Sequence, residues 1–261
     1  GFGSIADTLA ADKKMQAYFR SISHAQAISE HPMFEFGAVL DPSKEARARA
    51  ARTWGVNRLC ATTKELLDKY DPEILVITSP PTTRFEIIRS CRNLKGVFLE
   101  KPLGSDAAAI DDWARTLHIP IQVNYWRRAV PDFIALAKTA LVERIGRIQA
   151  VFGVYGNGLQ NNGSHLIDFS RMLLGEVTSV RSTGKAKAVT RAGFLDDINV
   201  GFNLGFDGDL VMTAMPLDFA KYREVGIDIW GTKGRLAINQ ESLTMQFFPR
   251  VANRGLENEK E

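Results

Sequence analysis

The feature that most constrains this fold is the regular alternation, through the first half of the chain, of short apolar runs with helix-like segments. The apolar runs lie at residues 34–40, 73–78, 96–99 and 120–124, and the helix-like segments lie at residues 43–54, 64–70, 83–93 and 106–117. Each apolar run has the length of a buried strand, and stop residues such as Gly55 separate the elements. Repeated βα units of this length predict an α/β fold with a parallel, doubly wound sheet.

The second half of the chain predicts a different architecture. A helix that begins at Pro131 and ends near Gly146 is followed by strand-like runs at residues 147–155, 177–187, 198–206, 209–215, 224–231 and 235–239. The pair Asp207-Gly208 and the segment 231–234 have the composition of hairpin turns. Strands joined by short turns pair antiparallel. We therefore predict two domains, residues 1–123 with a parallel sheet and residues 124–261 with an antiparallel one.

The apolar run 96–99 ends abruptly at Glu100, Lys101 and Pro102. Pro102 keeps Lys101 extended and prevents the strand from continuing, which places Lys101 at the edge where open α/β sheets bind ligands. An ammonium group that is partly desolvated at this edge can exchange a proton near neutral pH. On these residues alone, the simpler interpretation is that Glu100 and Lys101 are solvated loop charges.

The chain opens with Gly1, Phe2, Gly3, Ser4, Ile5 and Ala6, which fit the pattern G-x-G-x-x-G/A. Such a turn brings backbone N–H groups close to a pyrophosphate at the start of a helix, although the pattern alone is a weak signal. The turn requires a strand before it, so we expect the natural chain to begin earlier. A cleaved signal sequence stays open at this point.

An acidic residue that binds the adenosine ribose is expected about 20 residues after such a turn. Asp41, at the end of the run 34–40, has this character but comes later. We interpret residues 7–22 as an insertion between the turn and its helix, which Ser23 caps. The insertion either folds over a bound ligand or is an inert surface excursion.

Composition and charge exclude several classes of function. Lys and Arg number 33 against 30 Asp and Glu, the sequence pI is about 8.9, and no long basic run contains aromatic residues, so no nucleic-acid partner is expected. No apolar stretch approaches the length that spans a bilayer, so no membrane partner is expected. Cys60 and Cys91 lack C-x-x-C spacing, which predicts reduced core thiols, a cytoplasmic protein and no metal site.

Taken together, these motifs resemble the glucose-fructose oxidoreductase/inositol dehydrogenase/MocA family. The resemblance covers nearly the whole chain and rests on the glycine turn, Asp41, Ser79-Pro80-Pro81, Glu100-Lys101-Pro102, the run from Asn124 to Arg128, the run from Gly163 to Asp168, and Gly231 to Gly234. It implies an N-terminal Rossmann domain, a C-terminal α+β domain with a large open, mostly antiparallel sheet, and a nicotinamide cofactor in the cleft between them. It also implies a homodimer or homotetramer formed through the C-terminal sheet.

The resemblance assigns roles to individual residues. Lys101 lies beside the reacting carbinol and the nicotinamide, and Glu100 contacts the cofactor or orients the lysine. The residues expected to bind the cofactor are Gly1, Phe2, Gly3, Ser4, Ile5, Asp41, Thr78, Ser79, Pro80, Glu100, Lys101 and Asn124. The carboxylate of Asp41 favours NAD over NADP because it accepts a hydrogen bond from a ribose 2′-OH and repels a 2′-phosphate. Lys44 and Arg47 lie close in sequence and soften this preference, so NADP stays an alternative.

The second half contributes the expected substrate site. Tyr125, Trp126 and Arg127 have side chains that stack on a sugar face or bind a phosphate or carboxylate, whereas we expect Arg128 to form an interdomain ion pair. The residues expected to bind substrate are Lys101, Tyr125, Trp126, Arg127, Asn161 and His165.

The chain departs from the family motif D-x-G-x-H at one position, because Asn161 stands where the family has Asp. An amide cannot accept a proton as a carboxylate does. General-base duty therefore falls on His165 or Lys101, and Asn161 is limited to hydrogen bonding. His165 has a near-neutral pKa in its unperturbed state, and Asp168 either orients it or packs against the sheet.

These features predict an NAD(P)-dependent oxidoreductase that moves a hydride between nicotinamide and a secondary alcohol or ketone of a sugar, nucleotide sugar or cyclitol. The loop 160–165 and the insertion slightly favour a role in polysaccharide sugar synthesis. Two alternatives stay open. One is a cofactor-binding regulator that has lost turnover, which Asn161 suggests. The other is redox-neutral, NAD-assisted epimerisation or elimination.

Overall fold

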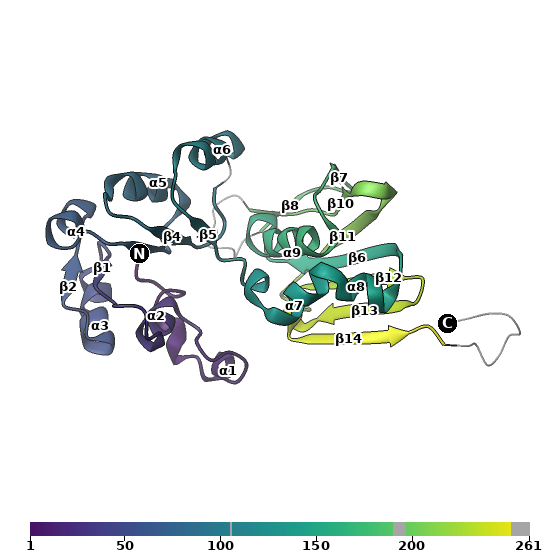
Figure 1. Cartoon of the computed structure of the whole chain (residues 1–261), viewed down its shortest axis with the longest axis horizontal. Coiled ribbons are helices and arrows are strands. Elements are labelled where there is room, and N and C mark those ends of the chain that lie inside the picture. Colours follow the sequence, from purple (N-terminus) through teal and green to yellow (C-terminus); the bar gives the residue numbers. More distant parts are fainter. Residues whose placement is uncertain (105, 190–196, 252–261) are drawn as a thin grey trace, which may run out of the picture. The chain divides into compact units, whose positions relative to one another are not determined.

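The structure of the protein is a computed structural model that describes residues 1–104, 106–189 and 197–251 (Figure 1). The chain divides into a first unit, residues 1–124, and a second unit, residues 125–261. Each unit has its own sheets and helices and is described by itself. No helix of the described residues is both long and apolar enough to cross a membrane.

The first unit consists of parallel strands connected by helices. Its strands are β1 (Ala38–Leu40), β2 (Arg58–Cys60), β3 (Ile74–Ile77), β4 (Gly96–Leu99) and β5 (Ile121–Val123). Its helices are α1 (Lys13–Gln16), α2 (His24–Glu30), α3 (Lys44–Trp54), α4 (Thr63–Lys69), α5 (Pro81–Ser90) and α6 (Ala107–Thr116), with a 3₁₀ turn at Thr8–Ala11. Strand β1 pairs with β2, and β3, β4 and β5 form a second sheet, all in parallel. The predicted α/β fold is confirmed.

Helix starts in this unit follow the expected capping chemistry. The side chains of Ser23, Ser43 and Thr62 each accept a hydrogen bond from the backbone N–H three residues later. A helix start leaves such N–H groups without an intrahelical partner, and a capping oxygen stabilises it by about 1 kcal/mol. The predicted starts of α2, α3 and α4 therefore agree with the structure to within one residue.

The expectation of a strand over residues 34–40 is wrong in its first half, since β1 begins only at Ala38. Local hydrogen bonds turn the chain before that point, from the N–H of Phe34 to the carbonyl of His31 and from the N–H of Gly37 to the carbonyl of Glu35. Backbone groups used in such turns are unavailable to a strand ladder. The apolar pattern of the run did not reveal these turns.

The second unit is built on a seven-stranded sheet in the order β14-β13-β12-β6-β11-β10-β7. The strands are β6 (Ile148–Gly156), β7 (Ser179–Ser182), β10 (Phe202–Gly205), β11 (Val211–Leu217), β12 (Gly226–Gly231), β13 (Gly234–Asn239) and β14 (Thr244–Pro249), and β8 (Lys187–Ala188) pairs with β9 (Ile198–Asn199). Only the pair β6 and β11 is parallel among the pairs of this sheet. The expected large, mostly antiparallel sheet is confirmed, as are the turns at 207–209 and 231–234.

Helices cover one face of this sheet and form the core of the second unit. They are α7 (Pro131–Ala135), α8 (Leu141–Ile145) and α9 (Ser164–Leu174), with π-helical turns at Leu136–Ala140 and Leu159–Gly163. Phe133, Leu166 and Phe169 on the helices join Met212 and Ile229 of the sheet in one apolar cluster. The burial of this cluster fixes which face of each strand points to the helices.

We expect Met212→Ala to destabilise the chain by about 2–5 kcal/mol, because Met212 is completely buried and its loss leaves a cavity against Leu166 and Gly153. The control is Val142→Ala on α8, an exposed side chain whose truncation changes stability by less than about 0.5 kcal/mol. Urea unfolding followed by circular dichroism measures both variants. Equal effects of the two substitutions would contradict the assigned core.

Candidate functional site

The glycine turn lies at the carboxyl ends of β1 and β3. The backbone N–H of Phe2 donates to Oδ2 of Asp41, 2.5 Å away, and the Thr78 hydroxyl donates to the carbonyl of Gly1. Oδ1 of Asp41 accepts from the N–H of Ser43 at 2.7 Å. The structure therefore brings Gly1 and Phe2 together with Asp41 and Thr78, which lie far from them in sequence.

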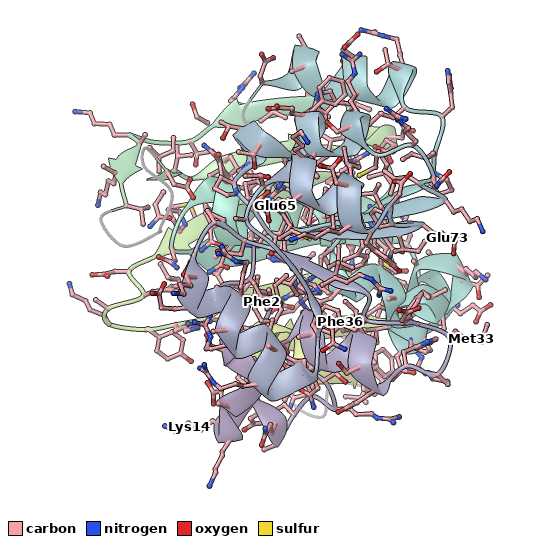
Figure 2. All side chains as sticks on the ribbon, turned by 90° about the vertical axis from the view of Figure 1, so that its left-hand side faces the viewer. Phe2, Lys14, Met33, Phe36, Glu65 and Glu73 are labelled. Carbon is pink, nitrogen blue, oxygen red and sulfur yellow. The ribbon has the colours of Figure 1, made fainter. Side chains whose placement is uncertain are left out.

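The glycine turn combines one buried side chain, that of Phe2, with an exposed backbone at Gly3. The Phe2 ring is buried and lies 6.2 Å from the Phe36 ring, while Lys14 and Met33 are exposed at the periphery (Figure 2). Gly3, Ser4 and Ile5 are exposed, and a Cβ on Gly3 would meet no atom within 4 Å. An exposed glycine turn with open space above it fits the approach of a pyrophosphate.

The segment predicted as an insertion, residues 7–22, begins and ends beside the glycine turn. The N–H groups of His24 and Ala25, in the first turn of α2, donate to the carbonyls of Ile5 and Ala6. Asp7 is buried and accepts from Arg49 Nε at 3.1 Å and from Trp54 Nε1 at 2.8 Å. The sequence analysis missed this anchoring role of Asp7, which a buried carboxylate can fill only with such partners.

Glu100 is a buried carboxylate at the carboxyl end of β4. Its Oε1 atom lies 2.8 Å from Nε2 of His24 and accepts a hydrogen bond from Nδ2 of Asn124 at 2.7 Å. Burial by itself raises the pKa of Glu100, but the hydrogen bonds from His24 and Asn124 and the charge of Lys101 outweigh it, so the pKa lies below its ordinary value. Glu100 is therefore held as a carboxylate beside Lys101.

His24 was not recognised as a site residue from the sequence. Its side chain is mostly buried, and its ring packs edge-on against Phe98 at 5.5 Å between centroids. A single histidine near a helix start gave no signal, because its partner Glu100 lies 76 residues away. The contact depends on the packing of α2 against the end of β4.

Arg84 fixes the backbone around Lys101. From α5, its buried guanidinium donates to the carbonyl of Ser79 at 2.9 Å, to that of Pro102 at 2.6 Å and to that of Glu100. Burial lowers the pKa of Arg84, and Glu100 partly offsets this effect. Carbonyls that follow β3 and β4 are thus bound to one cation, which positions Ser79, Pro80 and Lys101 at the same edge of the sheet.

The expected substrate residues of the second unit lie near the start of α9. The rings of Tyr125 and His165 contact each other edge-on, with centroids 5.6 Å apart, and the hydroxyl of Ser164 donates to the carbonyl of Asn161 at 2.9 Å. Burial raises the pKa of Tyr125, and its hydrogen bond with Ser164 opposes this rise. Tyr125, Asn161 and His165 are therefore neighbours in this unit.

Arg127 is held within the second unit. It donates to Oγ of Ser242 at 2.7 Å and to the carbonyl of Glu241 at 3.1 Å, and its guanidinium lies 4.7 Å from the centroid of the Trp126 ring. Burial lowers the pKa of Arg127 to about 10. These contacts describe a positioning role for Arg127, and its predicted contact with substrate stays a prediction.

The expectation for Arg128 is wrong. Its guanidinium Nε lies 2.8 and 2.9 Å from the two carboxylate oxygens of Asp168, on α9 of the same unit. Burial raises the pKa of Asp168, and the contact with Arg128 opposes the rise. Arg128 thus forms an intradomain ion pair, and it neutralises the carboxylate that was expected to orient His165 or pack against the sheet.

Asp197 supports the loop that carries Asn161. Oδ1 of Asp197 accepts from the N–H groups of Gln160 at 3.0 Å and Ile198 at 2.8 Å, and Oδ2 accepts from the N–H of Asn161 at 3.0 Å. Asp197 is only 1% exposed. At Gly158, where φ is +99°, a Cβ would lie 1.9 Å from Oδ2, so this glycine is required. No sequence pattern predicts this support, because Asp197 belongs to no motif.

Two known domain families match this chain. An oxidoreductase family with an NAD-binding Rossmann fold matches residues 17–125, and the GFO/IDH/MocA C-terminal domain matches residues 144–237. Levoglucosan dehydrogenase of Pseudarthrobacter phenanthrenivorans is 27% identical over 199 residues, which are 63% of this chain and 51% of that protein. Inositol 2-dehydrogenase of Rhizobium meliloti is 25% identical over 246 residues, 85% of this chain and 74% of that protein.

Solved structures share the fold. A levoglucosan dehydrogenase in complex with NADH has a TM-score of 0.71 at 22% identity and covers 91% of this chain and 74% of its own. The WlbA dehydrogenase from Chromobacterium violaceum, in complex with NADH and UDP-GlcNAcA, has a TM-score of 0.70 at 21% identity. The match covers 87% of this chain and 73% of that protein's chain. The chain spans about half the length of the curated levoglucosan dehydrogenase that it matches.

The lowered pKa of Glu100 predicts an acid dependence of stability. Its stabilising contribution is complete above the ordinary pKa of about 4.3 and is lost as the pH falls through the lower folded-state value. In Glu100→Gln this part of the dependence disappears. Urea unfolding between roughly pH 3 and pH 6 measures it.

The matched control for this experiment is Glu73→Gln, a largely exposed carboxylate just before β3. We expect this variant to keep the acid dependence of the unchanged chain. If Glu100→Gln also keeps it, Glu100 is not the group that titrates.

Proposed function

Because the chain belongs to the Gfo/Idh/MocA family of NAD-binding oxidoreductases, we propose that it is an NAD(P)-dependent dehydrogenase acting on a CH–OH group of a sugar, nucleotide sugar or cyclitol. The observation that carries the proposal is the gathering of the glycine turn, Asp41, Glu100 and Lys101 at the carboxyl ends of β1, β3 and β4. In open α/β sheets this edge is the ligand-binding edge. A role in polysaccharide sugar synthesis belongs to the same proposal.

The cofactor is held by the first unit in this proposal. The turn Gly1–Ile5 would bind the pyrophosphate, and Asp41 would bind the adenosine ribose. The nicotinamide end would be bound by Thr78, Ser79, Pro80, Glu100, Lys101 and Asn124. Both oxygens of Asp41 already accept a backbone N–H, yet a carboxylate has about four acceptor sites and keeps room for a ribose hydroxyl. Nη1 of Arg47 donates to the carbonyls of Asp41 and Pro42, and NADP stays the alternative cofactor. When bound, the nicotinamide supplies the hydride acceptor.

The side chains of the protein transfer the proton and position the substrate. In the direction of alcohol oxidation, the neutral amine of Lys101 would take the hydroxyl proton as the hydride leaves the carbinol carbon, and in the reverse direction its ammonium form would polarise the carbonyl oxygen and return that proton. His165 exchanges this proton with solvent as acid or base, and Asn161 hydrogen-bonds a neighbouring hydroxyl. Tyr125, Trp126 and Arg127 form the wall of the sugar site. The names of the relatives, levoglucosan and inositol dehydrogenases, support this substrate class.

The second part of the proposal is a cytoplasmic homodimer or homotetramer that forms through the face of the sheet opposite α9. Five apolar side chains from four strands lie on this face with 43–53% of their surface exposed: Phe152, Val211, Met215, Trp230 and Phe248. An apolar patch of this kind marks an interaction surface. Arg235 crosses it, paired with Asp228 and stacked over Trp230, which keeps the charge on this face neutralised.

The activity is tested by following NADH absorbance while the protein meets levoglucosan, inositols, free hexoses and UDP-GlcNAcA with NAD or NADP. We expect turnover on one class of substrate. Lys101→Met lowers kcat by about 10²–10⁴-fold, as expected for the loss of an acid–base group. The matched control is Lys95→Met, at the opposite end of β4, which keeps full turnover.

Binding of NADH without turnover on any of these substrates would contradict the dehydrogenase. Product formation without accumulated NADH would instead favour redox-neutral chemistry. Equal turnover by Lys101→Met and Lys95→Met would remove Lys101 from the mechanism.

For the assembly, we expect the unchanged chain to have the mass of a dimer or tetramer in light scattering after size exclusion. Phe152→Glu, at the centre of the apolar face on β6, reduces it to the monomer mass because a charge is buried in the interface. Val142→Glu replaces an equally exposed apolar residue on α8 and leaves the mass unchanged. A monomeric unchanged chain would contradict this part of the proposal.

A further inference from the structure

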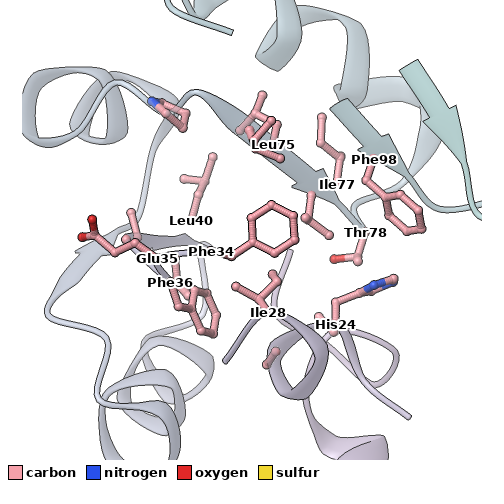
Figure 3. A pocket seen from close by; sticks show the side chains of 18 of the residues that line it. His24, Ile28, Phe34, Glu35, Phe36, Leu40, Leu75, Ile77, Thr78 and Phe98 are labelled. Carbon is pink, nitrogen blue, oxygen red and sulfur yellow. The ribbon is translucent and has the colours of Figure 1, made fainter. Parts of the chain in front are cut away.

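His24 contacts two parts of the first unit that are far apart in sequence. Its backbone N–H donates to the carbonyl of Ile5 in the glycine turn at 3.2 Å, and Nε2 of its ring lies 2.8 Å from Oε1 of Glu100. In Figure 3, the His24 side chain projects from α2 and lies beside Phe98, below Thr78. One residue thus connects the proposed pyrophosphate end of the site with its proposed nicotinamide end.

The surroundings of His24 hold its ring in one place. The preceding residue, Ser23, is buried and caps α2, and the next N–H, that of Ala25, donates to the carbonyl of Ala6 at 2.8 Å. The ring packs edge-on against Phe98, and only 15% of the side chain is exposed. The ring is therefore directed at Glu100 from a helix start that is itself anchored to the glycine turn.

The contact between His24 and Glu100 has a defined donor. A carboxylate has no proton to give, so Nε2 of His24 carries the hydrogen and donates it. Nδ2 of Asn124 donates to the same oxygen at 2.7 Å. Burial raises the pKa of Glu100, and the largest of the effects that oppose this rise is the hydrogen bond from His24. His24 is therefore the main partner of this buried side chain.

The loss of this partner would act on Lys101. The backbone at Glu100 is fixed, because its N–H donates to the carbonyl of Ile77 at 2.9 Å and its carbonyl accepts from Arg84. The side chain is not fixed in this way, and a buried carboxylate that loses a donor takes another. The charge of Lys101 already acts on Glu100. An ammonium drawn to Glu100 is displaced from the substrate oxygen and gives up its proton less readily.

We infer that His24 is a positioning residue for Lys101, because its hydrogen bond to Glu100 keeps that carboxylate from competing with the substrate for the lysine side chain. The inference rests on the proposed function, in which Lys101 exchanges the proton of the substrate. It adds to the proposed site a residue that acts through Glu100 and does not touch the substrate.

The test compares the unchanged chain with His24→Leu, His24→Gln and His31→Leu. Leucine fills much of the space of the ring but has no donor, whereas glutamine carries an amide N–H at about the reach of Nε2. His31 is an exposed histidine just after α2 and serves as the matched control. For each chain, kcat is measured on the substrate that the unchanged chain turns over, and the Kd of NADH is measured by fluorescence.

We expect His24→Leu to lower kcat by about 10–100-fold, because a displaced acid–base group loses its alignment with the substrate. The Kd of NADH changes by less than about threefold, because the backbone contact with Ile5 is kept. His24→Gln restores kcat to within about threefold of the unchanged chain, because the donor to Glu100 is restored. His31→Leu behaves as the unchanged chain.

A second readout requires no activity. The titration of the Glu100 carboxyl group is followed by NMR in chains with ¹³C-labelled glutamate. We expect its midpoint to rise in His24→Leu, because the largest effect that opposes burial is removed, and to stay near that of the unchanged chain in His24→Gln. The same midpoint in His24→Leu and in the unchanged chain would show that His24 does not hold this carboxylate.

The outcomes separate the inference from the function on which it rests. If the unchanged chain turns over and His24→Leu keeps its kcat, or if His24→Gln loses as much kcat as His24→Leu, His24 does not position Lys101, although the dehydrogenase stands. No turnover by the unchanged chain would contradict the proposed function and this role with it. If His24→Leu does not fold, His24→Asn replaces it, because its amide is one methylene shorter than that of glutamine and ends short of Glu100.

Discussion

The arrangement of the first unit depends on one buried cation. The guanidinium of Arg84 binds carbonyls that follow β3 and β4, so the two strands end at a fixed distance from each other. Glu100, whose carbonyl is one of these acceptors, in turn holds His24 and Asn124 through its side chain. A lysine on a free loop samples many positions, whereas Lys101 follows a residue that is held by both backbone and side chain. This rigidity is what a general acid–base group needs.

In the second unit, a buried anion binds backbone groups as the buried cation Arg84 does in the first. The carboxylate of Asp197 is buried and accepts three backbone N–H groups, of which two, those of Gln160 and Asn161, lie in the loop that carries Asn161. Buried charges are stable only when their hydrogen-bonding capacity is used, and such networks fix a unique conformation. In each unit, a buried charged side chain therefore fixes the backbone that carries a proposed site residue. Arg84 does this for Lys101, and Asp197 does it for Asn161.

Most secondary-structure elements of this protein could be predicted from its sequence, whereas contacts between residues distant in sequence could not. The βα alternation, the hairpin turns and the cap at Ser23 depend on neighbouring residues, so local pattern was sufficient. His24, Arg84 and Asp197 act through partners 16 to 76 residues away in sequence, and their side chains gave no periodic or motif signal. Arg128 was assigned to an interdomain pair because sequence does not reveal that α9 brings Asp168 to it.

The proposed function requires a hydride to pass between the substrate carbinol and a nicotinamide bound at the edge where Lys101 lies. The most direct measurement uses a substrate deuterated at the reacting carbinol carbon, with mass spectrometry of the NADH formed. We expect one deuterium per NADH and a slower turnover than with the unlabelled substrate. NADH without deuterium, or product formed with the deuterium retained at its carbon, would rule out this hydride transfer.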